Sequence, residues 1–429
     1  MSALRKARIE ETALYLGRGQ SPSYVDFETN THAINQKCIR DGKVDPSFAR
    51  AHDSKVLIKR DAFLQPGDIC INSTGTGTAG RIGLWLNSSE ELYFADSHVT
   101  IFRPNPEIFD FKYLATLLQT HRVQTDLETF CFSGSTNQVE LNRSAVLNLE
   151  LQFLSLSEQQ LIAQIFTLID RVIEQTEALI AKQQRIKTGL MQDLLTKGID
   201  EHGNIRSEAT HEFKDSPLGR IPKEWEVISL SKCAYVIDPQ PDHRTPPAVF
   251  DGIPYIGISD VKEHGGLDIA SVRKVSVEAF RKQNKRFGVE DGDIIFGKIG
   301  TLGLPKLLPI GIDFALSANV LLVKPHQQPK FIYWILDSNI TIQQVLFEVH
   351  ITSQPAFGIE KMRELNIPYP PVEEQRMISD TLDCYDKGIK TEAQKLSKYK
   401  SLKAGLMQDL LTGKVSVESL LAGQDAGGT

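Results

Sequence analysis

Glycine-rich residues 75–80 form the chain's most conspicuous chemical pattern. They read Gly75-x-Gly77-x-x-Gly80, a spacing that can wrap a dinucleotide pyrophosphate when a helix opens directly after it. Here the following residues, 81–86, contain Gly83 and are typical of a strand. The corresponding loop at 296–305 lacks the pattern and contains a proline. We therefore predict a strand–loop–strand, either structural or facing phosphates through its backbone N–H groups, and not a cofactor site.

Other signatures of catalysis are missing from the sequence. No Gly-x-x-x-x-Gly-Lys-Ser/Thr phosphate loop is present, and the ten histidines show no metal-ligand spacing. The run Pro368-Tyr-Pro-Pro371 follows Ile367, whereas an amino-methyltransferase motif has Asp or Asn there. The five cysteines are scattered and never form Cys-x-x-Cys, which favours reduced cytoplasmic thiols over zinc or disulfides. We expect no catalytic residue, metal or cofactor in this chain.

Two local runs of basic residues say more about function than the catalytic motifs do. The whole chain carries a formal net charge of −6, yet residues 271–288 hold six basic residues against one acid. Residues 37–61 hold seven basic residues against four acids. Either run alone is most simply a solvated face. Because both runs precede a Gly-Asp-Ile segment at matching places, together they favour a common ligand, and the phosphate backbone of nucleic acid is the natural one.

An internal repeat organises these segments. The octapeptide Gly-Leu-Met-Gln-Asp-Leu-Leu-Thr occurs at 189–196 and again at 405–412, which is an offset of 216 residues in a chain of 429. Residues 157–188 match their counterparts at seven of 32 positions, after which the octapeptide matches completely. Upstream, Asp68 parallels Asp293 and Arg103 parallels Lys324. The chain is therefore predicted to contain two copies of one unit.

A long helix is predicted at the end of each copy. Apolar residues from Ile162 to Leu190 follow a 3.5-residue period, typical of a coiled-coil seam, and Ile378 to Leu406 follow it again. Ser157 and Gln160 have capping-box spacing, and Gly198 and Gly413 can end the helices. A helix of about 40 residues is about 60 Å long. We expect the two helices to pair antiparallel, the alternative being that each packs only on its own globular part.

The globular parts show short apolar runs broken by Gly, Pro, Asn and Asp, which predicts β-rich domains within an α/β (α+β) fold. No run of 18 apolar residues exists, and the first residues do not resemble a signal peptide. The predicted organisation is a first globular domain at 1–150, a helix at 151–199, a linker at 200–212, a second domain at 213–371, a helix at 372–415, and a disordered tail at 416–429.

Taken together, these features resemble the DNA-specificity subunit of type I restriction–modification systems. The resemblance rests on the two octapeptide-ending helices, the run Leu365-Asn-Ile-Pro-Tyr-Pro-Pro-Val-Glu-Glu-Gln375, and Leu218–Trp225. Ser135-Thr-Asn-Gln138 matches a short polar motif of the family, and Ser353–Ala356 matches it more loosely. The first copy departs from the family by lacking the prolines before its helix and the segment that resembles Leu218–Trp225.

The resemblance implies two target-recognition domains held apart by two antiparallel helices, each domain reading one half of a bipartite, asymmetric double-stranded DNA site. It also implies that the helices dock two modification (methyltransferase) subunits, which restriction subunits join. S-adenosylmethionine, Mg and ATP are then expected on the partner subunits only. Two other interpretations remain open: a stand-alone duplicated DNA methyltransferase, and a coiled-coil scaffold that does not bind DNA.

Candidate residues follow from the charge runs and the repeat. The predicted phosphate contacts are Lys37, Arg40, Lys43, Lys55, Lys59 and Arg81 in the first domain, and Arg273, Lys274, Arg281, Lys282, Lys285, Arg286, Lys298 and Lys306 in the second. The predicted partner-docking residues are Leu190, Met191, Gln192, Leu406, Met407 and Gln408. For the octapeptides, the alternative is that both copies simply pack on their own domains.

Overall fold

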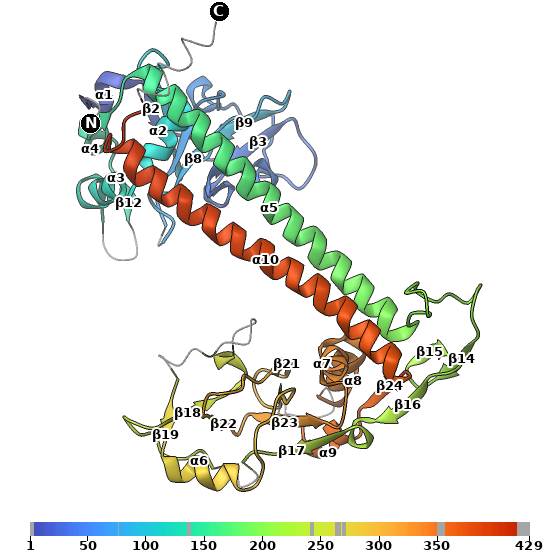
Figure 1. The fold of residues 1–429 in the computed structure, drawn as a ribbon. Helices are drawn as coiled ribbons and strands as arrows, with labels where there is room; N and C mark the ends of the chain where they lie inside the picture. Colours follow the sequence, from blue (N-terminus) through green and yellow to red (C-terminus); the bar gives the residue numbers. More distant parts are fainter. Residues whose placement is uncertain are drawn as a thin grey trace, which may run out of the picture. The chain divides into compact units, whose positions relative to one another are not determined.

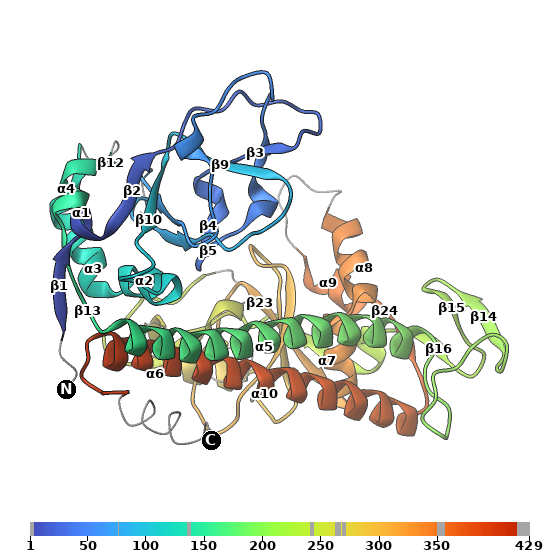
Figure 2. The same cartoon turned by 90° about the horizontal axis from the view of Figure 1, so that it is seen from above.

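The computed structural model describes residues 4–75, 77–134, 139–240, 244–261, 267, 272–349 and 357–417. The chain forms two compact units (Figures 1 and 2): unit 1 is Met1–Gln175 with Lys395–Thr429, and unit 2 is Thr176–Gln394. The polar motifs predicted at 135–138 and 353–356 lie outside the described residues. So does most of the predicted tail, although Val417 is buried in the core of unit 1.

A six-stranded sheet lies at the centre of unit 1. Its order is β2 (Ala13–Arg18), β10 (Val99–Pro104), β7 (Ile69–Asn72), β8 (Ile82–Leu84), β5 (Gly42–Val44) and β4 (Ile39–Arg40). A second sheet is β6 (Arg50–Ala51), β3 (Thr31–Ile34) and β9 (Leu92–Ala95), and β1 (Arg5–Arg8) pairs with β13 (Glu150–Phe153). Helices α2 (Phe111–Leu118), α3 (His121–Asp126) and α4 (Arg143–Asn148) pack on one face.

Burial on both faces of the main sheet explains the unbroken apolar run of β7. Ile69 and Ile71 join the core beneath α2, while Cys70 between them faces a second core that contains Trp85 and Ile101. A strand covered on both faces needs apolar residues at successive positions, because its side chains alternate between the two faces.

Unit 2 repeats this arrangement. Its main sheet has the order β17 (Ala234–Ile237), β23 (Val320–Pro325), β20 (Ile294–Gly297) and β21 (Gly303–Leu307). Beside it lie β19 (Lys274–Val275), β18 (Ile253–Ile256) and β22 (Ala315–Leu316), and β16 (Glu226–Ser229) pairs with β24 (Asn366–Tyr369). Helices α6 (Val277–Asn284), α7 (Pro329–Asp337), α8 (Asn339–Val349) and α9 (Ile359–Arg363) complete the globular part.

The two main sheets share a strand order, since β2-β10-β7-β8 corresponds to β17-β23-β20-β21. A buried ion pair repeats as well: Arg103 binds Asp68 at 2.7 Å and Lys324 binds Asp293 at 2.7 Å. The predicted duplication and the α/β class are therefore confirmed. Beyond the shared strands, β5 and β4 extend the sheet of unit 1, whereas the described sheet of unit 2 ends at β21.

The long helices are α5 (Leu156–Thr196) and α10 (Val372–Leu411), close to the predicted ranges. Gly198 and Gly413 follow them with positive φ of 69° and 66°, which confirms their role as stops. The predicted cap at Ser157 is displaced by two residues. Ser155 instead donates to the Glu158 carboxylate through its backbone N at 3.1 Å and its hydroxyl at 2.6 Å, because Ser155 and Glu158 have the Ser-x-x-Glu spacing.

Within each unit, one part of α5 lies antiparallel against one part of α10 (Figures 1 and 2). In unit 1, Lys403 of α10 binds Asp170 of α5 at 2.7 Å. In unit 2, Lys187 of α5 binds Asp386 of α10 at 2.6 Å. These are the same pair in the two copies, since Lys187 and Asp170 each recur 216 residues later.

These partly buried carboxylates are stabilised in their charged form. Burial alone would raise the pKa of Asp170, but hydrogen bonds and positive charge from Lys112 and Lys403 outweigh it and lower that pKa. Burial is likewise outweighed at Asp386, where Lys187 and Lys390 lower the pKa. The two ion pairs therefore stabilise the helix pairing at neutral pH.

The octapeptides do not pack on the globular parts that precede them. Leu194 and Leu195 lie in the core of unit 2 beside Trp225, and Leu410 and Leu411 lie in the core of unit 1. The interpretation in which each helix packs only on its own globular part is therefore wrong, because each helix contributes to both units. The compact units consequently cut across α5 and α10 and differ from the linear domain ranges predicted above.

Candidate nucleic-acid interface

The glycine-rich loop of unit 1 connects β7 to β8, as the sequence predicts. Gly75, Gly77 and Gly80 have positive φ of 99°, 73° and 82°, a region that favours glycine. Among the described residues, strand β8 follows the loop from Ile82, in the place where a dinucleotide site requires the start of a helix. The Gln36 amide donates to the Thr74 hydroxyl at 2.9 Å, which ties the start of this loop to the turn after β3.

A hairpin beside this loop carries two of the predicted cations. Asp41 and Gly42, with φ of 48° and 78°, form the turn between β4 and β5, and Arg40 and Lys43 are paired across it. Two positive φ values are typical of a type I′ turn. Lys43 forms an ion pair with Glu174 of α5, whereas Arg40 remains exposed. The hairpin therefore has one cation engaged in a surface ion pair and one available to a ligand.

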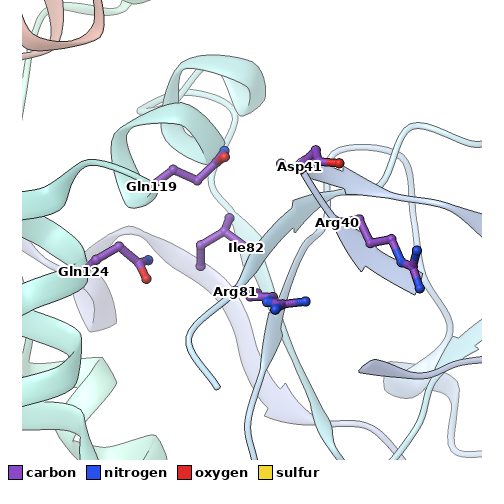
Figure 3. Close-up of a pocket in the computed structure, with 7 residues that line it drawn as sticks. Arg40, Asp41, Arg81, Ile82, Gln119 and Gln124 are labelled. Atoms are coloured by element: carbon purple, nitrogen blue, oxygen red, sulfur yellow. The ribbon is translucent and has the colours of Figure 1, made fainter. Parts of the chain in front are cut away.

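A hollow of about 720 Å³ lies between this hairpin, the end of the loop before β8, and helices α2 and α3. Figure 3 shows Gln119 and Gln124 on the helix side of the hollow and Arg40 and Arg81 on the strand side, with the end of the Arg40 side chain directed away from the two glutamines. Gln124 donates to the Gly80 carbonyl at 3.3 Å, and Arg81 donates to the Gly77 carbonyl at 3.1 Å. The hollow thus combines amide and guanidinium groups, the types that read base edges in DNA grooves.

Two exposed arginines of unit 1 lie over aromatic rings. The Arg40 guanidinium lies 4.0 Å from the ring centroid of Phe48, and that of Arg50 lies 3.7 Å from the centroid of Tyr24. Burial raises the pKa of Tyr24, so the ring under Arg50 carries a neutral phenol. Sequence reasoning counted Arg50 in the charge run but did not select it. It also missed Gln119 and Gln124, because no local pattern indicates which distant residues fold together.

The other predicted cations of unit 1 are exposed, but only Lys37 lies beside Arg40. Lys37 lies in the 3₁₀ turn Gln36–Cys38, where its carbonyl accepts a hydrogen bond from the Arg40 Nε at 2.7 Å. Lys55 and Lys59 lie in the segment between β6 and β7, and both side chains are exposed. The structure therefore brings Lys37, Arg40 and Arg81 to one region.

In unit 2 the basic run forms an exposed surface around α6. Ser276 caps this helix through a bond to the Ala279 N at 3.2 Å, and the Gln283 side chain is buried against Leu316. The remaining cations follow the exposed side and the end of the helix. They are Arg281, Lys282, Lys285 and Arg286. Arg286 also donates to the Pro239 carbonyl at 3.3 Å, which orients its guanidinium.

Arg273 lies beside a second polar hollow, of about 280 Å³. This hollow is lined by Thr301 of the β20–β21 loop, and by Ser317 and Asn319 ahead of β23. The loop corresponds to the glycine-rich loop of unit 1, so both units place a Gly-Thr loop next to basic and amide-bearing residues. Lys274, on β19, is half-buried.

Two predicted cations of unit 2 are placed differently. Lys298 is buried and binds the Asp238 carboxylate at 2.6 Å, so its charge is neutralised inside the protein. Phosphate contact by Lys298 therefore has no structural support, because a buried ion pair would first have to break. Lys306 lies half-buried on β21.

Within the residues that the structure describes, no group of three or more His, Cys, Asp or Glu side chains is arranged to hold a metal ion. None of the described helices has a stretch long and apolar enough to cross a membrane. The features that remain are exposed cations and glycine loops at corresponding places in two similar units, together with a polar hollow in each unit. This arrangement is suited to a long polyanion.

Comparison with known proteins gives a consistent answer. A model described as the type I restriction modification DNA specificity domain matches residues 26–184 and 222–400, one stretch for each copy of the repeat. The type I restriction enzyme MjaVIII specificity subunit of Methanocaldococcus jannaschii is 25% identical over 430 residues, covering 96% of this chain and 93% of that protein.

Solved structures show the same architecture. The type I restriction–modification S subunit from M. genitalium matches with a TM-score of 0.58 at 16% identity and covers 96% of each chain. A chain from a structure on complex assembly and conformational transition of the type I R-M system matches with a TM-score of 0.54 at 16% identity, covering 95% of this chain and 97% of that one. At such identities the likeness establishes the fold.

Proposed function

The chain belongs to the type I restriction–modification DNA-specificity family, and from that membership we propose that it reads one bipartite, asymmetric DNA site through the globular parts of its two units. The observation that carries the proposal is the shared strand order combined with unlike surfaces. The globular parts of the two units share a fold but carry different polar side chains, so they are suited to binding two half-sites of different sequence. Base contacts supply sequence discrimination, and phosphate contacts supply register and affinity.

The exposed cations around α6 are the proposed phosphate contacts of unit 2, together with Arg273 and Lys274. In unit 1 the corresponding group is Lys37, Arg81 and, on the segment after β6, Lys55 and Lys59. Each contacted phosphate releases condensed counterions, so affinity should fall steeply with salt. Because the whole chain has a formal net charge of −6, high affinity is expected to need the partner subunits.

A salt titration of DNA binding by the assembled complex tests this assignment. Replacing Arg281, Lys282 and Lys285 with glutamine should flatten the plot of log affinity against log salt, by about 0.9 for each phosphate that is no longer neutralised. Lys223→Gln is the matched control, since Lys223 pairs with Glu212 beside the β14 (Phe213–Ser216) and β15 (Gly219–Pro222) hairpin. An unchanged slope in the triple variant would remove α6 from the interface.

The octapeptides are the proposed docking sites for two modification subunits. Leu190, Met191, Leu406 and Met407, predicted to touch the partner, pack partly against the cores of the units. Gly189 and Gln192 are exposed in one copy, and their counterparts Gly405 and Gln408 are exposed in the other. Thr412 is exposed as well, whereas its counterpart Thr196 is half-buried. Repetition of the same exposed surface supports two copies of one partner.

The glycines strengthen this argument. A Cβ built on Gly189 or Gly405 meets no atom within 4 Å beyond the adjacent residues and nearby backbone of its own helix, so packing inside the protein does not require glycine there. Glycine within a helix costs about 0.5–1 kcal/mol relative to alanine. Its presence at both positions favours close approach of an external backbone. One turn earlier, Ile186 and Leu402 present exposed aliphatic side chains at matching positions.

The remaining parts of the assembly follow from the family. We expect restriction subunits to join the core formed with the modification subunits, in the cytoplasm. S-adenosylmethionine, Mg and ATP are expected on those partners. With the cofactors on the partner subunits, this chain recognises the DNA site and holds the partner subunits together.

A further inference from the structure

Arg40 is fixed in position without a carboxylate partner. Its guanidinium lies 4.0 Å from the Phe48 ring centroid, and its Nε donates to the Lys37 carbonyl at 2.7 Å. Among the described residues no carboxylate lies within ion-pair distance of it. The pKa of Asp45 is lowered mainly by hydrogen bonds from Ser47, and the more distant Arg40 charge lowers it further. The stacked face and the Nε bond constrain the plane of the group, which leaves the two terminal nitrogens as an exposed fork.

The platform under Arg40 is itself held by side-chain bonds. Phe48 lies in the 3₁₀ turn Pro46–Phe48, whose start is capped by Asp45 accepting from the Ser47 N at 2.9 Å. Asn35 donates to the Phe48 carbonyl at 3.1 Å. Phe48 is 40% exposed, which is unfavourable for an apolar ring. The attraction between the ring and the Arg40 guanidinium offsets part of that cost.

The neighbouring cation on the hairpin is used differently. Lys43, paired with Arg40 across the hairpin, binds Glu174 of α5 and so anchors the hairpin to the long helix. This ion pair occupies the charge of Lys43, while the Arg40 fork on the other side of the turn stays open. A lysine meets an acceptor as a point charge, whereas an oriented planar fork suits a two-point acceptor, which can be a base edge or a phosphate.

Resting on the DNA-recognition function above, we propose that Arg40 reads a guanine of the half-site bound by unit 1. The O6 and N7 atoms of guanine form a two-point acceptor on its major-groove edge, and an arginine fork matches it. The β4 strand that carries Arg40 lies at the edge of the main sheet of unit 1, because β5 pairs with β8 on its other side. The β4–β5 ribbon extends the sheet of unit 1 beyond the strands that both units share, as expected of an element that distinguishes the two half-sites.

The test compares two matched charge removals, Arg40→Gln and Lys37→Gln, in the assembled complex acting on a random-sequence DNA library. The methylated sequences are read out together with the salt dependence of binding. Arg40→Gln should relax selection at a single guanine of one half-site by about tenfold. Lys37→Gln should leave the selected sequence intact, weaken all sites equally and reduce the salt slope by about 1.

Phe48→Leu provides an independent variant, because it keeps the Arg40 charge and removes only the ring. It should relax the same guanine, and it decides the question if Arg40→Gln fails to assemble. An unchanged selected sequence in Arg40→Gln, with uniformly weaker binding, would make Arg40 a phosphate contact and overturn the proposal. The proposed function would survive that result. It would fail instead if the unmodified complex selected no sequence at all.

Discussion

At the scale of single residues, a Glu-Gln pair lies near the start of each long helix. Its glutamine makes the same contact in both copies, and its glutamate makes different ones. Gln159 and Gln375 make the same bond, each amide donating to the carbonyl of the residue five positions earlier, at 2.9 and 2.8 Å. The glutamates differ. Glu158 accepts from Ser155, which caps α5, whereas Glu374 binds residues far away in the chain.

Glu374 ties the segment after α5 to the start of α10. Its carboxylate forms an ion pair with Arg206 and accepts from the Ile199 N at 3.0 Å and the Trp225 Nε1 at 3.0 Å. The Glu374 and Arg206 side chains are only 8% and 13% exposed, so each charge depends on the other. The second copy thus uses a shared helix-start residue to fix its entry segment.

Glu374→Ala should therefore lower the free energy of unfolding of unit 2 by about 3–5 kcal/mol, because Arg206 would stay buried without a partner. Urea unfolding followed by tryptophan fluorescence measures this, since Trp225 and Trp334 both lie in the core of unit 2. Glu373→Ala, which removes an exposed pair with Arg376, is the control and should leave the midpoint unchanged. Equal effects of the two variants would refute the account.

The acidic residues of the paired helices predict a pH dependence. The pKa values of Asp170 and Asp386 are lowered in the folded protein, so their contribution to stability is present above the unfolded pKa, about 4. That contribution is lost as the pH falls through the folded values. Replacing both residues with asparagine should lower stability at pH 7 and weaken its decline below about pH 4. Parallel curves for the variant and the unmodified chain would contradict this.

At the scale of elements, α5 and α10 each serve both units. The apolar period of 3.5 residues and the glycine stops are local signals, so the helix ranges could be predicted closely. Packing of the second part of each helix against the globular part of the other copy could not, because it depends on residues such as Trp225 that lie outside the period. The octapeptide leucines serve this packing, and its glycines remain exposed.

Gly189→Ala and Gly405→Ala should each stabilise the free chain by up to about 1 kcal/mol, because alanine favours the helix and its Cβ meets no atom beyond the adjacent residues and nearby backbone of its own helix. The same changes should weaken binding of the modification subunit, and leucine at either position should do so more strongly. Native mass measurement should show two partner subunits on the unmodified chain and one on each single leucine variant.

Ala181→Leu, at an exposed position of α5 outside the octapeptide, serves as the control for added bulk. The docking proposal is wrong if both leucine variants still bind two partner subunits with undiminished affinity.

At the scale of the whole molecule, duplication was evident from the sequence because repeats align by simple offset. The exposed basic surface of α6 was also predictable, since its cations are local in sequence. The roles of Lys43 and Lys298 were not, because their partners Glu174 and Asp238 are distant in sequence and become neighbours only on folding. Likewise, nothing local links Arg50 to Tyr24.

The central claim is that each unit reads its own half of one DNA site, and a domain exchange tests it most directly. Residues 213–370 would be replaced by the equivalent domain of a relative with a different specificity, and methylated sites of the assembled complex would be mapped. We predict that one half-site changes to that of the relative while the other stays as before. A change in both half-sites, or in neither, would contradict the account.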